Sequence, residues 1–170
     1  MRKIAITGPE STGKSRLARQ LADHFSTVYV PEFARGYIDS LDRPYEHNDI
    51  VEIARGQLQM EREMAPKANR LLICDTELIV AKIWSLHTYG SCDPFILENI
   101  LDNRYDLFLL CDVDLPWEED PQREHPHLRG FFFDWYKREL ESYGFLFEII
   151  RGMGRQRLER AIGYVDGLKV

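Results

Sequence analysis

Long apolar runs and an excess of basic residues are both missing from this 170-residue sequence. No stretch approaches the ~20 apolar residues that a membrane-spanning helix needs, and the opening MRKIAIT lacks the anatomy of a signal peptide. The 22 Lys and Arg residues are outnumbered by 28 Asp and Glu residues, which gives a formal net charge of −6. A general nucleic-acid binder would need the opposite balance. We therefore expect a cytoplasmic protein that binds neither membranes nor nucleic acid.

Cysteine is also sparse, and the sequence contains only Cys74, Cys92 and Cys111. Cys74 and Cys111 lie inside apolar runs, which predicts buried, reduced thiols. No spacing of cysteines and histidines is typical of a zinc site, and the HPH sequence at residues 125–127 is expected in an exposed loop. The sequence therefore gives no indication of a zinc site.

Short apolar runs alternate with amphipathic segments along the chain. The apolar runs predict buried parallel strands over residues 3–7, 27–30, 71–75, 105–112 and 146–150. Helical spacing predicts helices from residue 14 onward and over residues 49–64, 78–87, 94–101, 131–143 and 155–168. This alternation predicts a single α/β domain over residues 1–170, with a doubly wound parallel sheet and a binding crevice at the carboxyl ends of its strands.

The sequence GPESTGKS at residues 8–15 has the spacing of a phosphate-binding loop, and it lies between a predicted strand and a predicted helix. Gly8 and Gly13 allow the backbone to turn its N–H groups toward phosphate oxygens, and the amino end of the following helix adds partial positive charge. Lys14 is expected to bind the β- and γ-phosphates, and the Ser15 hydroxyl to ligate Mg²⁺. The residues expected to contact ATP are Gly8, Glu10, Ser11, Thr12, Gly13, Lys14, Ser15 and Arg16.

Two carboxylates follow predicted strands at the sheet edge where the phosphate-binding loop lies. Asp75 ends the run LLICD, where it could hold Mg²⁺ through water or cap the next helix. Glu32 and Arg35 in PEFAR could orient and deprotonate an acceptor hydroxyl and hold a polar acceptor, or form an ordinary surface pair. The sequence leaves open whether Glu32 or Asp75 is the general base.

A polar segment at about residues 117–130 interrupts the regular pattern and predicts a lid. Its Arg123 and Arg129 would neutralise a transferring phosphoryl group while the lid excludes water, although a plain charged loop has the same composition. Trp84 and Tyr89 are predicted to stack against a flat acceptor, with core packing as the alternative for Trp84. The sequence GMGRQR follows the fifth predicted strand, which in a sheet of this type lies near the nucleotide base.

Signatures of other proteins with this loop are missing. The sequence has no Asn-Lys-x-Asp guanine reader of GTP switches and no Ser-Gly-Gly-Gln signature of transporter ATPases. Ring-forming ATPases bring a helical second domain, which is not expected here. The phosphate-binding loop, the acid after the second strand and the arginine-bearing lid together indicate a small-molecule kinase.

The chain resembles the ribosylnicotinamide (nicotinamide riboside) kinase domain of the NadR type in the stretches GPESTGKS, VPEFAR, CDTELIVAKIWSLHTYG, YDLFLLCDVDLPWEED and GMGRQRLERA. The resemblance implies a three-layer α/β/α P-loop NTPase fold with five parallel strands in the order 2-3-1-4-5. It also implies phosphorylation of nicotinamide riboside to nicotinamide mononucleotide in NAD salvage, with ATP as donor and Mg²⁺ as cofactor. The resemblance also supplies the expected roles at the acceptor of Glu32, Arg35, Asp75, Trp84 and the lid arginines.

The regulators that name this family carry an adenylyltransferase domain, and some a DNA-binding domain, ahead of the kinase. Neither activity is expected of the present sequence. ATP and a small nucleoside-like acceptor are the expected partners. A kinase of another nucleoside or nucleotide and a regulatory P-loop ATPase remain as alternatives.

Overall fold

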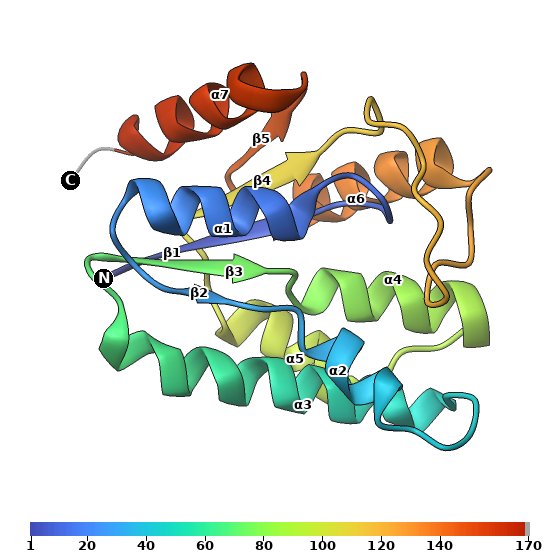
Figure 1. Cartoon of the computed structure of the whole chain (residues 1–170). Helices are drawn as coiled ribbons and strands as arrows, with labels where there is room; N and C mark the ends of the chain where they lie inside the picture. The colour runs from blue at the N-terminus through green and yellow to red at the C-terminus, as the bar shows by residue number, and fades with distance from the viewer. Residues whose placement is uncertain (169–170) are drawn as a thin grey trace.

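The computed structural model describes residues 1–168, and its centre is a five-stranded parallel sheet in the order β2-β3-β1-β4-β5 (Figure 1). This confirms the expected fold class and strand order. The predicted domain boundary at residue 170 lies outside the described residues. The strands are β1 Arg2–Thr7, β2 Tyr29–Val30, β3 Leu71–Asp75, β4 Leu107–Cys111 and β5 Phe147–Ile150.

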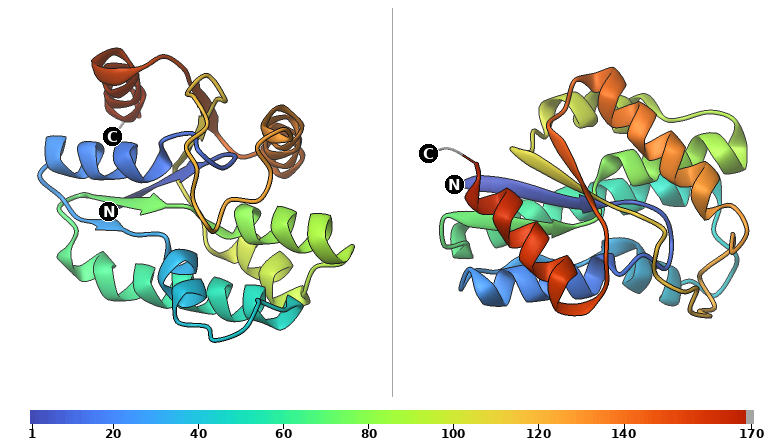
Figure 2. Two further views of the ribbon diagram at one scale, coloured as in Figure 1. Left: turned by 45° about the vertical axis from the view of Figure 1, so that its right-hand side comes forward. Right: turned by 90° about the horizontal axis from the view of Figure 1, so that it is seen from above.

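Helices cover both faces of the sheet (Figure 2). Helices α1 and α7 pack on one face, and α3, α4, α5 and α6 pack on the other. The helices are α1 Lys14–His24, α2 Phe33–Asp39, α3 His47–Met64, the 3₁₀ helix η1 Ala65–Lys67, α4 Leu78–Tyr89, α5 Pro94–Asp102, α6 Arg129–Tyr143 and α7 Gly154–Asp166.

Alternation along the central strands divides the core into two layers. Ile4 and Ile6 of β1 pack toward α1 and α7, whereas Ala5 between them packs toward the α3–α6 layer. Neighbouring residues point to opposite faces of a strand, so a strand buried on both faces is apolar throughout. None of the helices in the described residues is long and apolar enough to span a membrane.

The main difference from the sequence prediction is α2, a seven-residue helix that directly follows β2. It is too short to show a hydrophobic period, and none of its residues is fully buried. Helix α6 begins at Arg129 and not at residue 131. Cys74 and Cys111 are free thiols and completely buried, as predicted.

Glu77 is a buried carboxylate between the sheet and α4. The Thr7 hydroxyl donates a hydrogen bond of 2.7 Å to Oε1, and the backbone N–H of Ile79 donates one of 2.6 Å to Oε2. Glu77 therefore caps the start of α4, the role that was considered for Asp75. Burial raises the pKa of Glu77 to about 7, against the opposing effect of these two hydrogen bonds.

We expect Glu77→Gln to remove a pH dependence of stability. The folded-state pKa lies above the ordinary value of about 4.3, so the native state binds more protons than the unfolded state between about pH 4 and 7. The free energy of unfolding of the wild type should fall with rising pH across that window, relative to Glu77→Gln. The relative loss amounts to up to about 3 kcal/mol. Urea unfolding of both proteins at several pH values measures it, and parallel curves would contradict the assignment.

Candidate active site

The loop at residues 8–15 has the backbone shape of a phosphate cradle. Gly8 (φ +133°) passes so close to β4 that a Cβ atom would lie 2.8 Å from the carbonyl oxygen of Cys111. At Gly13 (φ +76°) a Cβ atom would lie 2.9 Å from Leu115 Cδ1. Ser11 is also left-handed, at φ 56°. Conformation and space both exclude a side chain at Gly8, whereas at Gly13 it is the left-handed backbone that favours glycine.

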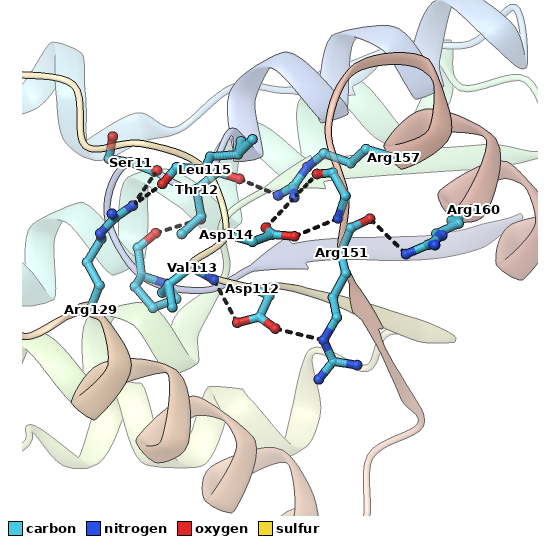
Figure 3. A network of polar contacts seen from close by, with 12 residues as sticks. Ser11, Thr12, Asp112, Val113, Asp114, Leu115, Arg129, Arg151, Arg157 and Arg160 are labelled. Atoms are coloured by element: carbon cyan, nitrogen blue, oxygen red, sulfur yellow. Dashed lines mark hydrogen bonds and ion pairs between the residues drawn. The ribbon is translucent and has the colours of Figure 1, made fainter.

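Two arginines hold the outer side of this loop (Figure 3). Arg129 of α6 donates hydrogen bonds to the carbonyl oxygens of Ser11 (3.1 Å) and Leu115 (2.8 Å). Arg157 of α7 donates to the carbonyl oxygen of Thr12 and is itself buried. Because carbonyl and N–H groups point in opposite directions along a chain, carbonyls tied to the outside favour amides that point inward.

Arg157 also connects the phosphate-binding loop to the segment before α7 (Figure 3). Its Nη1 donates to the carbonyl oxygen of Gly152 (3.2 Å) and to Asp114 Oδ1 (3.3 Å). The backbone N–H of Gly152 donates to the other oxygen of Asp114 at 2.6 Å. The start of GMGRQR is thereby joined to the loop that would hold the phosphates.

Lys14, Ser15 and Asp75 meet at the start of α1. Lys14 Nζ donates to the carbonyl oxygen of Pro9 (2.7 Å), and the Ser15 hydroxyl donates to Asp75 Oδ2 (2.5 Å). The other oxygen of Asp75 is buried without a hydrogen-bond partner in the described part of the chain. The pKa of Asp75 is raised to about 6, mainly by burial and in smaller part by the negative charge of Glu32. A carboxylate with an unpaired oxygen beside a hydroxyl fits a hard cation such as Mg²⁺.

No group of three or more His, Cys, Asp or Glu residues within residues 1–168 could hold a metal by protein ligands alone. Mg²⁺ is usually bound by one or two protein groups together with phosphates and water. Ser15 and Asp75 are the residues here that could hold it.

Glu32 occupies the N-cap position of α2, without a capping hydrogen bond from its side chain, and lies at the same edge of the sheet as the phosphate-binding loop. Since β3 separates β2 from β1, the two strand ends are about 10 Å apart. Arg35 lines the cavity at this edge, and its Nη1 forms an ion pair of 2.8 Å with Asp120. The ordinary Glu32–Arg35 surface pair is thus not formed.

Residues 112–128, here called the lid, cross over the site between β4 and α6. Glu10 accepts hydrogen bonds from the backbone N–H groups of Glu124 and His125, and Ser11 Oγ accepts one from Glu118 N–H. Arg123 lines the cavity and donates to the carbonyl oxygen of Glu118. The predicted lid limits of 117–130 were too far along the chain, since Arg129 belongs to the first turn of α6.

A cavity of about 720 Å³ runs along this edge of the sheet. One end is bounded by Met153, Gly154 and Arg157, the middle by the phosphate-binding loop, and the other end by aromatic side chains. Trp84 lines the aromatic end and also packs against the core, so it has the core packing considered as the alternative, and its stacking against an acceptor stays a prediction. Tyr89 is outside the cavity wall, where its ring stacks on His47 (centroids 4.5 Å apart).

Several residues of the aromatic end were not predicted from the sequence. Tyr45 precedes α3, and its ring meets Trp84 edge-on, with centroids 4.8 Å apart. The spacing of Val80, Ile83, Trp84 and His87 on one face of α4 is a helical signal that could have identified His87. The further wall residues at this end are Thr88, His125, Phe132 and Tyr136.

Comparison with known proteins agrees with this geometry. The model of the AAA domain family AAA_28 matches residues 3–157. Two curated relatives, the trifunctional NAD biosynthesis/regulator proteins NadR of Salmonella typhimurium and Escherichia coli, are each 31% identical over 127 residues, or 72% of this chain. The chain spans only 31% of the length of these relatives.

Solved structures show the same fold. A crystal structure of NadR in complex with NR has a TM-score of 0.84 at 23% identity, over 99% of this chain and 52% of that chain. Thymidylate kinase from Ehrlichia chaffeensis has a TM-score of 0.66 at 12% identity, over 96% of this chain and 98% of that chain. The chain belongs to the AAA_28 family, and its predicted resemblance to the P-loop domain of the NadR type is confirmed.

Proposed function

We propose that this chain transfers the γ-phosphoryl group of ATP to the 5′-hydroxyl of nicotinamide riboside and so forms nicotinamide mononucleotide. The proposal rests mainly on one observation: the phosphate-binding loop, Glu32 and the aromatic end all line the same cavity. Phosphoryl transfer needs little more than an anchored triphosphate, a positioned acceptor hydroxyl and exclusion of water. The curated relatives bear the name NAD biosynthesis/regulator protein, and one similar structure was solved with NR, which supports this acceptor.

The aromatic end suits a flat, positively charged acceptor. Tyr45 and Trp84 line the cavity with their rings edge-on to each other, and the faces of aromatic rings attract cations. The Tyr45 hydroxyl donates to Glu124 Oε1 at 2.9 Å, which holds a carboxylate at the same end. Arg35 is neutralised by its ion pair with Asp120. The nicotinamide ring of the proposed acceptor is a pyridinium cation, so the local charge favours it.

The phosphates would occupy the middle of the cavity. Lys14 would exchange its bond to the Pro9 carbonyl for the β- and γ-phosphates, and the loop amides would bind phosphate oxygens. Mg²⁺ held by Ser15 and Asp75 would supply charge neutralisation of the phosphates. Arg123 would exchange its bond to Glu118 for the transferring group.

Glu32 would orient the acceptor hydroxyl and take its proton. It is half-exposed in the cavity wall, whereas Asp75 is buried and bonded to Ser15. Asp75 is thus better suited to the cation, and Glu32 to the acceptor. The transition state is loose, so the proton leaves late and the contribution of Glu32 is mainly orientation.

The proposed activity is tested with purified protein, Mg-ATP and a panel of nucleosides, by following ADP release and the phosphorylated product. We expect turnover that depends on nicotinamide riboside, and Lys14→Ala should remove nearly all of it, a loss of at least about 10³-fold. Turnover with another nucleoside alone would assign that acceptor in its place. Slow hydrolysis that no acceptor stimulates would contradict a kinase.

Glu32→Gln keeps the size of the side chain and removes its negative charge. We expect kcat to fall about 10²-fold, with the KM for ATP changed less than about 2-fold, because Glu32 faces the acceptor. Steady-state kinetics in both substrates measures this. Glu52→Gln, on the exposed face of α3, is the matched control. Unchanged kcat in Glu32→Gln would show that the base is misassigned.

Arg157→Met keeps the buried stem of the side chain and removes its hydrogen bonds to Thr12, Asp114 and Gly152. We expect the KM for ATP to rise about 10-fold, the cost of about one buried charged hydrogen bond, with little change in the KM for the acceptor. Arg155→Met is the control, since Arg155 is exposed and pairs only with Glu159 of its own helix among the contacts described for it. Equal KM values for ATP would refute the connection.

A further inference from the structure

Helix α2 forms a wall between the cavity and α3. Glu32, Ala34, Arg35 and Ile38 line the cavity. Phe33 and Tyr37, which are one helical turn apart, instead face α3. The position of the cavity-facing side of α2, which includes Glu32, therefore depends on the contacts that Phe33 and Tyr37 make with α3.

Gly56 of α3 leaves the space into which the Phe33 ring fits. A Cβ atom on Gly56 would lie 2.1 Å from Cε1, 2.3 Å from Cζ and 2.5 Å from Cδ1 of that ring. These distances are far below van der Waals contact, so the ring lies directly on the bare backbone of α3. Gly56 is in the middle of an 18-residue helix, where glycine is otherwise unfavourable compared with alanine. Its φ is not positive, so packing and not backbone conformation explains it.

Gln57, the next residue of α3, fixes the start of α2. Its Oε1 accepts a hydrogen bond of 2.9 Å from the backbone N–H of Phe33. That N–H is one of the groups at a helix start that have no partner inside the helix. Gln57 is buried and belongs to another helix, so its amide fixes both the capping and the location of α2.

The other end of α2 is also attached to α3. The Tyr37 hydroxyl donates to Asp49 Oδ1 at 2.8 Å, and Arg43 holds the same carboxylate with bonds of 2.7 and 3.1 Å. Asp49 in turn accepts the backbone N–H of Glu46 as part of the capping box of α3. With both ends attached, a displaced Phe33 ring can move only by rotating about its own side-chain bonds or by shifting the first turn of α2, next to Glu32.

We propose that Gly56 and Gln57 are positioning residues for Glu32, which they place through Phe33 without touching the substrate. The inference deepens the proposed function and rests on it for the role of Glu32. It assigns a functional reason to a glycine that is neither in a turn nor near a phosphate.

Gly56→Ala adds a single methyl group beneath the Phe33 ring. We expect kcat for acceptor phosphorylation to fall about 10-fold, since small misplacement of a catalytic group is costly, while the KM for ATP stays within about 2-fold. Overpacking beneath the ring lowers stability while alanine favours the helix, so kcat is measured well below the melting temperature of both proteins, where the unfolded fraction is negligible. Gly163→Ala in α7 is the matched control, as nothing lies within 4 Å of a Cβ atom there.

A double-mutant cycle tests whether the Phe33 ring carries the effect. Phe33→Ala removes the ring, so adding Gly56→Ala to it should cause no further loss. Full additivity of the two kcat losses would overturn the inference. The variant Gln57→Leu should have a reduced kcat, whereas Gln57→Glu should retain it. Glutamate keeps an acceptor oxygen, and Nε2 has no partner to lose among residues 1–168.

A structural measurement separates this inference from the proposed function. Crystal structures of the wild type and of Gly56→Ala should differ in the position of Glu32 relative to β3. An unmoved Glu32 would overturn the inference whatever the acceptor is. If Glu32 moves in a protein that phosphorylates no nucleoside, the positioning of Glu32 by Gly56 is supported, and only the proposed activity is refuted.

Discussion

The orientation of the backbone between residues 8 and 15 is the constraint on which the rest of the structure depends. N–H groups can point into the cradle only if the carbonyls are satisfied elsewhere and the turns are free of side chains. Gly8 meets the second condition against the backbone of β4, and Gly13 meets it against Leu115. Arg129 and Arg157 meet the first condition from α6 and α7. Helices remote in sequence are thus needed to present a local motif.

The phosphate side of the site could be predicted from the sequence because its information is local. The glycine spacing, Lys14 and Ser15 lie within one short loop, and the strand order places Asp75 beside it. Apolar runs were sufficient to find the strands, since the central strands β1, β3 and β4 are largely buried on both faces. Only the ends of the strands differ from those predicted: β2, for example, has two residues, whereas residues 27–30 were expected.

The acceptor side could not be predicted to the same degree, because its parts come from separate segments. Tyr45 precedes α3, Trp84 and His87 are on α4, and Glu124 and His125 are on the lid. No periodic pattern relates these positions. Tyr89 is not part of this wall, since it follows Trp84 by five residues and its ring stacks on His47, and its contact with an acceptor stays a prediction. Helix α2, with seven residues and none fully buried, left only the weak one-turn spacing of Phe33 and Tyr37 as a hydrophobic signal.

Residues of the phosphate-binding loop connect these two sides. Glu10 and Ser11 offer their backbones to the cradle, while their side chains bind N–H groups of the lid at Glu124, His125 and Glu118. Anything that alters the loop on binding phosphate therefore acts directly on the lid. The lid in turn reaches α2 through Asp120, which pairs with Arg35. The phosphate-binding loop, the lid and α2 are thus linked through the side chains of a few residues.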